Sequence, residues 1–312
     1  MFKQLARPMA AASTKLIQNG TVVANATTQL AVRPNSTTAN FVPDKNVVFP
    51  SNTRLLICDM AGTTVDEQGI VYDTLFNTMN IHGLDVAWDE MHPWHGASKI
   101  MVIEHFCKRS DVGKRSPDDF KGWVDAVHYH FVKNIEKAYF EDDILSLIDP
   151  KLPEYMNNLR ENGMKVALNT GYPVKIQNAI MEKLNMHEFI DGFVSAETVG
   201  GRPKPFMIHR LMYDLGIDHV KDVAKAGDAN ADIGEGIKDG VGFNIGVLSG
   251  ADDGPTLRNM GADVVVENIT KISLGACCGQ HDFEVDGVRK TPLYNVKVGG
   301  QSQGKVIKTP LW

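Results

Sequence analysis

The chain has 312 residues, of which 43% are hydrophobic, and a formal net charge of −6 at neutral pH. This length and apolar content suffice for a sizeable core and two domains, and the negative charge excludes a broad nucleic-acid-binding surface. Its apolar runs fall short of the ~20 residues of a membrane-spanning helix, which excludes a membrane partner. The four cysteines form no disulfide or metal-ligand pattern, which favours a reducing, intracellular compartment.

The first 50 residues differ in composition from the rest of the chain. No aspartate or glutamate precedes Asp44, whereas basic residues, serine and threonine occur repeatedly. This composition is typical of an organelle transit peptide, and a disordered leader without a targeting function is the alternative. We therefore predict an N-terminal extension over residues 1–50 and a location in the cytoplasm or the mitochondria.

From residue 54 onward, short apolar runs alternate with helical patterns. Strands are predicted at 54–58, 165–169, 189–195, 223–226, 242–247 and 262–266, and helices at 152–162, 174–184 and 205–215. Gly163 and Gly216 follow two of these helices, as is typical of helix ends. Strands that alternate with helices indicate βαβ units, so the predicted fold is α/β with a Rossmann-like parallel sheet.

A long helical stretch interrupts this alternation directly after the first strand. It covers roughly residues 71–147, is rich in Met, His, Trp and Phe, and ends before Asp149-Pro150. We predict an inserted helical cap over 69–148, with the core formed by 51–68 and 149–273. Residues 274–312 form a C-terminal extension to which the pattern assigns no role.

Residues that can carry chemistry lie in four loops next to the predicted strands and helices. The first loop has the sequence DMAGTTVD over residues 59–66, and the others contain Thr170-Gly171-Tyr172, GRPKP over 201–205 and GDANAD over 227–232. The carboxyl ends of parallel strands meet at one rim of an open α/β sheet, where ligands bind. Carboxylates gathered there can hold Mg²⁺, and one carboxylate can attack a bound phosphoryl group to form an aspartyl phosphate.

This order of motifs resembles that of the haloacid dehalogenase-like hydrolases over roughly residues 54–269. The first motif of that superfamily is normally D-x-D, whereas this chain has D-x-A at Asp59 and Ala61. That variant, the GRPKP segment and Gly96-Ala97-Ser98-Lys99 in the cap are similar to the phosphonatase family, in which the lysine of G-x-x-K forms a Schiff base.

The chemistry of the residues agrees with this resemblance. Ala61 stands where the usual general acid stands, and it cannot protonate an alkoxide leaving group. A carbon leaving group needs no such acid once Lys99 has condensed with an aldehyde, because the C–P bond then breaks to an enamine. Burial under a cap favours the neutral amine that the condensation requires.

The resemblance implies a role for each matching residue. Asp59 would be the nucleophile and a Mg²⁺ ligand, Ala61 would offer its backbone carbonyl to the metal, and Asp228 would be a second side-chain ligand, with Asp232 ligating or orienting. Thr170 and Arg202 would bind the phosphoryl group, and Lys99 would form the Schiff base. The residues that would contact the substrate are Thr63, His95, Gly171 and Tyr172. The implied reaction is hydrolysis of phosphonoacetaldehyde to acetaldehyde and phosphate. The expected partners are a small phosphonate or phosphate and a second copy of the chain bound through the cap.

Three positions depart from the phosphonatase pattern. Val102 replaces a histidine three residues after the Schiff-base lysine, His95 replaces a methionine, and Gly69 lies near where some members have a cysteine. Positions four apart share a helix face, so a helix through Lys99 would allow His95 to supply the missing imidazole.

Two further classes of function stay open. Val102 and Gly69 favour a hydrolase of another phosphorylated metabolite that works without a Schiff base, and Ala61 alone favours a catalytically weak phosphometabolite-binding protein. The histidines His92, His95 and His105 match no standard zinc spacing, so packing or solvation is their expected role.

Overall fold

The computed structural model of the chain describes residues 41–141, 144–199, 205–275, 283–285 and 288–290. Its centre is a six-stranded sheet with the order β5-β4-β1-β6-β7-β8, in which neighbouring strands are parallel. The strands are β1 (Leu55–Cys58), β4 (Lys165–Thr170), β5 (Gly192–Ser195), β6 (Val223–Gly227), β7 (Phe243–Val247) and β8 (Val264–Val266). The predicted α/β fold with a Rossmann-like parallel sheet is confirmed.

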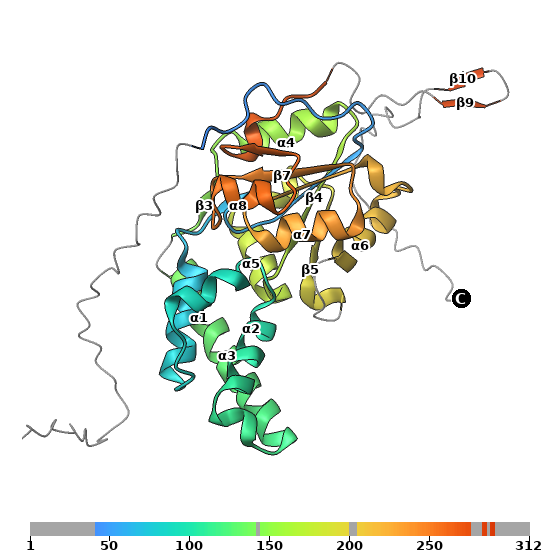
Figure 1. Cartoon of the computed structure of the whole chain (residues 1–312). Helices are drawn as coiled ribbons and strands as arrows, with labels where there is room; N and C mark the ends of the chain where they lie inside the picture. The colour runs from blue at the N-terminus through green and yellow to red at the C-terminus, as the bar shows by residue number, and fades with distance from the viewer. Residues whose placement is uncertain (1–40, 142–143, 200–204, 276–282, 286–287, 291–312) are drawn as a thin grey trace, which may run out of the picture. The chain divides into compact units, whose positions relative to one another are not determined.

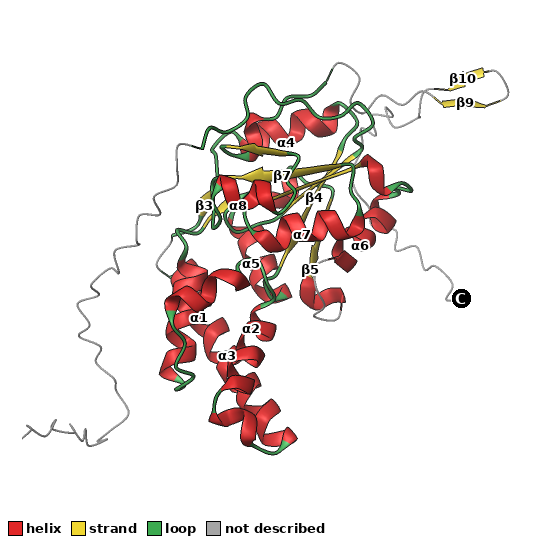
Figure 2. Ribbon diagram, viewed as in Figure 1, coloured by secondary structure: helices red, strands yellow, loops and turns green. Residues whose placement is uncertain are grey.

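Helices cover both faces of this sheet (Figure 2). Successive side chains of a strand point to opposite faces. Leu56 of β1 therefore packs with α4 (Leu152–Glu161) and α5 (Val174–Lys183), whereas Leu55 packs with α6 (Pro205–Leu215). Helix α7 (Asn230–Asp239) contacts α6 and follows β6, and α8 (Gly254–Asn259) packs on β7 and β8.

A helical cap is inserted after the first strand. It contains α1 (Ile70–Ile81), α2 (Lys99–Arg109) and α3 (Pro117–Phe140), with the short 3-10 helices η1 (Trp88–Trp94) and η2 (Asp111–Lys114) between them. Figure 1 shows α1, α2 and α3 grouped together, apart from the helices that flank the sheet. Their apolar faces meet in a buried cluster to which Val102, Phe106 and Phe131 belong.

A two-stranded ribbon joins the two ends of the cap. Strand β2 (Val65–Asp66) pairs antiparallel with β3 (Ser146–Leu147), and the Ile148 N–H donates to the Thr64 carbonyl at 3.0 Å. The predicted cap limits lie beside this ribbon, since residue 69 comes just before α1 and residue 148 just after β3. Strands of two residues are too short to show an alternating pattern in the sequence.

Residues 41–50 pack against the sheet, which corrects the predicted extension over residues 1–50. Phe49 is buried in the main core against Phe243, and the Asp44 carboxylate accepts from the Val265 N–H at 2.7 Å. The Ser273 N–H also donates to the Val47 carbonyl at 2.9 Å. The core therefore includes residues before position 51.

The remainder of the two predicted extensions lies mostly outside the described residues. The exceptions are residues 274–275, of which Leu274 packs against the core, and a hairpin of β9 (Phe283–Val285) and β10 (Val288–Lys290) in the C-terminal part. Across the described ranges, no helix is both long enough and apolar enough to cross a bilayer.

Candidate active site

Two aspartates flank the point where the sheet topology reverses direction. From β1 the chain continues through β4 and β5 on one side, and through β6, β7 and β8 on the other. Asp59 follows β1 directly, and Asp228 follows β6. Because the carboxyl ends of parallel strands at such a reversal form a ligand-binding crevice, these two side chains lie where a substrate is expected.

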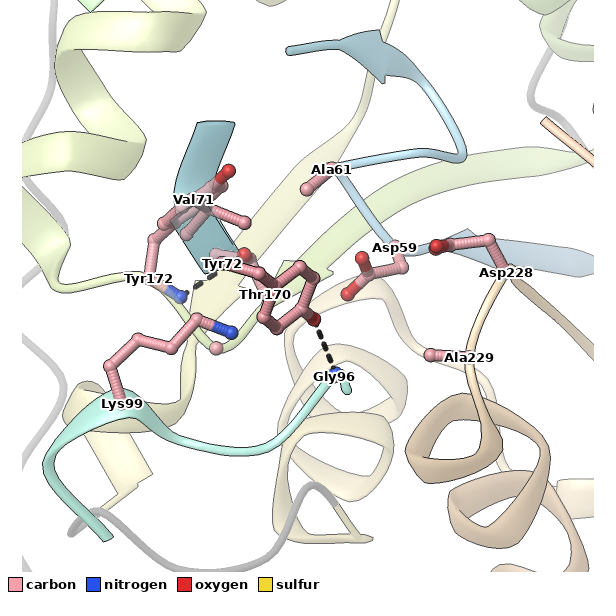
Figure 3. A pocket seen from close by; sticks show the side chains of 11 residues that line it. Asp59, Ala61, Val71, Tyr72, Gly96, Lys99, Thr170, Tyr172, Asp228 and Ala229 are labelled. Carbon is pink, nitrogen blue, oxygen red and sulfur yellow. Dashed lines mark hydrogen bonds between the residues drawn. The ribbon is translucent and has the colours of Figure 1, made fainter. Parts of the chain in front are cut away.

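A cavity of about 20 Å³ lies between this sheet edge and the cap (Figure 3). Seven of the residues predicted from the sequence line it, namely Asp59, Ala61, Lys99, Thr170, Gly171, Tyr172 and Asp228. A volume of this size holds about one water molecule. Residues of the cap and residues at the strand ends thus line one small cavity.

A tight turn after β1 brings Asp59 and Asp228 together. The Met60 carbonyl accepts from the backbone N–H groups of Thr64 and Val65 at 2.9 and 2.8 Å. Gly62 has φ 76°, and a Cβ there would lie 2.5 Å from Asp228 Oδ2. Only glycine combines this left-handed backbone with such a close approach.

Thr63 lies in this turn and contacts Asp228. Its hydroxyl donates to Asp228 Oδ1 at 3.0 Å, and the side chain is fully buried. Thr63 is absent from the described residues that line the cavity. The structure thus shows a contact of Thr63 with a carboxylate, and its contact with substrate stays a prediction.

Three buried carboxylates form the acidic side of the site. Asp59, Asp228 and Asp232 each offer an oxygen, and these oxygens lie within 4.8 Å of one another. Burial, together with the charges of Asp232 and Asp59, raises the pKa of Asp228 well above its ordinary value. A divalent cation bound by oxygen ligands would relieve this repulsion, so the residues fit Mg²⁺.

A buried lysine, which the sequence analysis missed, partly balances these charges. Lys225 lies in β6 with no exposed surface. Its Nζ donates to the Ala226 carbonyl at 2.7 Å and to Asp232 Oδ1 at 3.1 Å. The hydrogen bond from Lys225 therefore orients the Asp232 carboxylate, which also lies near those of Asp59 and Asp228.

Lys99 approaches the cavity from the cap. It is the first residue of α2 and is 5% exposed, and its Nζ donates to the Ala97 carbonyl at 3.2 Å. The amine lies 4.6 Å from the centre of the Tyr72 ring, and the Tyr72 hydroxyl accepts from the Gly96 N–H at 2.6 Å. Figure 3 shows Tyr72 between Lys99 and Asp59. No motif singled out Tyr72, although it lines the same cavity.

Hydrogen bonds of three hydroxyl-bearing residues and one carboxylate lie at the third side of the cavity. The Thr170 hydroxyl accepts from the Tyr172 N–H at 3.2 Å, and the Tyr172 and Tyr139 hydroxyls lie 2.7 Å apart. The Tyr139 hydroxyl donates to Glu67 Oε2 at 3.1 Å. Burial raises the pKa of Glu67 to about 7, although a Val71 N–H bond and the Tyr139 hydroxyl act in the opposite direction. Sequence reasoning found neither Glu67 nor Tyr139, because both lie outside the motifs from which the site was predicted.

The prediction that His95 shares a helix face with Lys99 is wrong. His95 follows η1 and lies before α2 begins. Its ring packs on Tyr72 with 4.3 Å between centroids, and its Nδ1 lies 3.5 Å from Asp252 Oδ1. His95 is not among the described residues that line the cavity. Val102 is buried in the cap core, and Arg202 lies outside the described residues.

A second cavity of about 550 Å³ adjoins the first. It shares Lys99, Gly171 and Tyr172 with the small cavity, and helices α2 and α3 supply much of its wall. His128 lies in this wall, and burial lowers the pKa of its imidazole. Lys99 thus borders a larger space on the cap side as well as the small cavity.

The sequence matches a family model described as haloacid dehalogenase-like hydrolase over residues 53–238. Among curated proteins, the chain is 30% identical over 207 residues to a phosphonoacetaldehyde hydrolase of Parabacteroides distasonis, which covers 64% of this chain and 77% of that protein. It is 27% identical over 226 residues to the phosphonoacetaldehyde hydrolase of Syntrophobacter fumaroxidans, covering 70% of this chain and 80% of that protein.

Among solved structures, a phosphonoacetaldehyde hydrolase-like protein from Oleispira antarctica is similar, with a TM-score of 0.58 and 21% identity. The match covers 74% of this chain and 93% of that one. A haloacid dehalogenase-like hydrolase from Bacteroides fragilis gives a TM-score of 0.56 at 16% identity, over 70% of this chain and 99% of that one. At these identities the structural likeness concerns the fold alone.

Proposed function

Because the chain belongs to the haloacid dehalogenase-like hydrolases, as a phosphonatase-like member, we propose that it hydrolyses phosphonoacetaldehyde to acetaldehyde and phosphate. The observation that supports this most strongly is that the Lys99 amine and the Asp59 carboxylate line one cavity. Ala61 lines the same cavity and offers no acid. A primary amine and a nucleophilic carboxylate are the two groups that cleavage of a C–P bond next to an aldehyde requires.

In the proposed reaction, each bond change belongs to one of these two residues. The Lys99 amine condenses with the aldehyde and releases water. An Asp59 oxygen then attacks phosphorus, and the electron pair of the breaking C–P bond moves into the iminium to give an enamine on Lys99. Protonation of the enamine carbon and hydrolysis release acetaldehyde, while water hydrolyses the aspartyl phosphate on Asp59.

The other residues bind and shield the reacting groups. The Thr170 hydroxyl at the end of β4 would donate to a phosphoryl oxygen, and Tyr72 and Tyr172 would exclude water from the imine. Asp59, Asp228 and the Ala61 carbonyl would hold Mg²⁺, with Asp232 beside them. The ion would offset the repulsion between the Asp59 carboxylate and the phosphoryl oxygens. From the sequence, Arg202 would add positive charge to the phosphoryl group.

Borohydride trapping tests the proposal directly. Borohydride added during turnover of phosphonoacetaldehyde should reduce the imine, inactivate the enzyme and leave an ethyl adduct or phosphonoethyl adduct on Lys99, as read by peptide mass spectrometry. Lys99→Arg keeps the charge but cannot form the imine. Its phosphate release should fall by on the order of 10⁴-fold or more, as after removal of a nucleophile.

Lys121→Arg is the matched control, because Lys121 lines the larger cavity and its Nζ contacts Asp125 on the exposed surface of α3. This variant should keep its activity and its adduct on Lys99. Full phosphate release by Lys99→Arg, or an adduct on another lysine, would contradict the proposed chemistry.

The second candidate is a phosphatase without Schiff-base chemistry, acting on a larger phosphate ester. The adjoining cavity of about 550 Å³ favours it, because phosphonoacetaldehyde would leave most of that space unfilled. In this case borohydride would have no effect, and a panel of phosphate esters would be hydrolysed by wild-type protein and by Lys99→Arg alike.

A further inference from the structure

Two imidazoles of the cap and one carboxylate of the core converge beside the candidate active site. His92 Nε2 and His95 Nδ1 each lie 3.5 Å from the same atom, Asp252 Oδ1. All three ligand atoms lie within 4.8 Å of one another. The histidines belong to the segment of η1, whereas Asp252 lies in the loop between β7 and α8, so the cluster spans the cap and the core.

The inner atoms of this cluster are buried without hydrogen bonds. Among the described residues, Asp252 Oδ1 and His95 Nδ1 have no hydrogen-bond partner, and the Asp252 side chain has no exposed surface. The other oxygen, Asp252 Oδ2, accepts from the Asn230 N–H at 2.7 Å, which fixes the carboxylate with Oδ1 toward the imidazoles. A buried carboxylate oxygen without a donor is costly unless a proton or a cation compensates it.

The spacing suits a metal ion better than it suits hydrogen bonds. Ligands at 2.0–2.1 Å from a tetrahedral Zn²⁺ are separated by about 3.4 Å, close to the 3.5 Å found from each imidazole nitrogen to Asp252 Oδ1. Two imidazoles with one carboxylate form a nitrogen-rich set that selects Zn²⁺ or a similar transition metal over Mg²⁺. We propose that His92, His95 and Asp252 bind a Zn²⁺ ion, separate from the all-oxygen site of Asp59, Asp228 and Asp232.

An ion bound there would fasten the cap to the core. The His92 side chain is 57% exposed, so the ion can reach the cluster from solvent and keep a fourth position for water. The segment after His95 leads directly to Lys99, and the Asp252 N–H donates to the Asp228 carbonyl at 3.0 Å. Because His92 and His95 belong to the cap segment and Asp252 to the core, Zn²⁺ bound to all three would restrain movement of the cap against the core and slow any step of turnover that requires this movement.

Metal titration of the full chain tests the site. Calorimetry with Zn²⁺, and visible absorption with Co²⁺, should each detect one ion per chain in millimolar Mg²⁺, measured in a Cys277→Ser/Cys278→Ser background that removes adjacent thiols. His92→Ala alters an exposed ligand and should weaken binding by more than the roughly 10–100-fold that loss of an outer-shell partner costs. Asp252→Asn should do the same. Zn²⁺ should also slow hydrogen exchange in a peptide covering residues 92–99, and His92→Ala should abolish this effect.

Two matched variants separate this site from its neighbours. His105→Ala removes another imidazole of the cap, packed on Trp94 with 4.6 Å between centroids, and should bind Zn²⁺ as wild type does. Asp59→Asn disables the all-oxygen site and should also leave Zn²⁺ binding unchanged, whatever the substrate of the enzyme. The proposal fails if Zn²⁺ affinity is unchanged in both His92→Ala and Asp252→Asn, or if Asp59→Asn abolishes it. Either result would leave the cluster as an imidazole–carboxylate contact alone.

Discussion

At the scale of single residues, the crowding of carboxylates around Asp228 links metal binding to stability. Burial, and after it the charges of Asp232 and Asp59, raises the pKa of Asp228, so repulsion between carboxylates opposes its ionisation in the metal-free site. We expect Asp228→Asn to bind Mg²⁺ at least 10-fold more weakly while unfolding at the same or a higher temperature in chelator. In wild type, Mg²⁺ should raise the melting temperature by mass action, because it binds only the folded state.

Differential scanning fluorimetry with and without Mg²⁺ measures this, with calorimetry for the affinity. Asp218→Asn is the control, because Asp218 has an 87% exposed side chain and pairs with Arg54 at the surface, away from the three carboxylates. An equal Mg²⁺-dependent shift in Asp228→Asn and in wild type would contradict the role of Asp228 as a ligand.

Glu67 makes stability depend on pH. Its pKa is raised from 4.5 to about 7 in the folded protein, chiefly by burial. Between these values the unfolded chain has lost the proton and the folded chain retains it, so the free energy of unfolding falls as pH rises. The loss is on the order of 3 kcal/mol and is complete above pH 7. Glu67→Gln should therefore match wild type near pH 4.5 and be the more stable protein at pH 8.

Urea unfolding of both proteins across this pH range measures the difference. Glu161→Gln at the exposed end of α4 should track wild type at every pH. A constant difference between Glu67→Gln and wild type would mean that Glu67 does not titrate in this window.

At the scale of elements, Gly96 controls how closely the cap segment approaches the core. It has φ 75°, and a Cβ there would lie 2.9 Å from the Cβ of Ala231 in α7. Gly96→Ala should therefore cost more than the ~1–2 kcal/mol of a left-handed alanine and lower kcat/KM, because the adjoining Lys99 would be displaced from the cavity.

Gly83→Ala separates the cost of a left-handed alanine from the steric contact that Gly96→Ala would add. Gly83 in the cap has φ 74°, and a Cβ there would meet nothing within 4 Å. This variant should lose stability through strain alone and keep its kcat/KM. Steady-state phosphate release and urea unfolding of the two variants compare the effects, and equal kcat/KM values would show that the Gly96 contact has no catalytic consequence.

At the scale of the whole molecule, the segment before β1 completes the core. A chain lacking residues 1–40 should fold and keep its activity, whereas one lacking residues 1–50 should lose the burial of Phe49 and the pairing of Asp44 with Val265. Removal of a buried phenylalanine alone costs about 3–5 kcal/mol. Thermal unfolding and phosphate release of the two truncated chains measure this.

Neighbouring substitutions in the full chain give the same comparison without truncation. Phe49 is 2% exposed and Val48 is 48% exposed. Phe49→Ala should therefore destabilise by about 3–5 kcal/mol, and Val48→Ala by less than about 1 kcal/mol. Similar losses for the two would contradict a core position for Phe49.

Much of the architecture could be predicted because the apolar runs of a parallel sheet are continuous and its loops lie on one rim. The strand at 54–58 and the carboxylate after it were visible in the sequence for this reason. Lys225 was not, because a lysine within a short strand gives no sign that its amine reaches a buried aspartate.

Contacts between residues far apart in the chain could not be predicted from the sequence either. The pairing of Asp252 with His92 and His95 joins the core to the cap, and no local spacing predicts it. The packing of Phe49 was missed because the apolar run that it ends, from Val47 to Phe49, is only three residues long and stops at Pro50, so it does not indicate a strand or a helix. The position of His95 depended on where α2 begins, and helix limits are poorly defined by periodicity.

The ribbon of β2 and β3 gives the cap two covalent connections that run side by side. Two adjacent chain connections of this kind act as a hinge, whose easiest motion is rotation about an axis near the ribbon. If the cap swings on this hinge, Lys99 travels with it while Asp59 stays on the sheet. Under the proposed chemistry, opening of the cap after C–P cleavage would draw the two-carbon fragment on Lys99 away from the phosphoryl group on Asp59. This separation would prevent the C–P bond from forming again. Acetaldehyde would then be released from the cap and phosphate from the core.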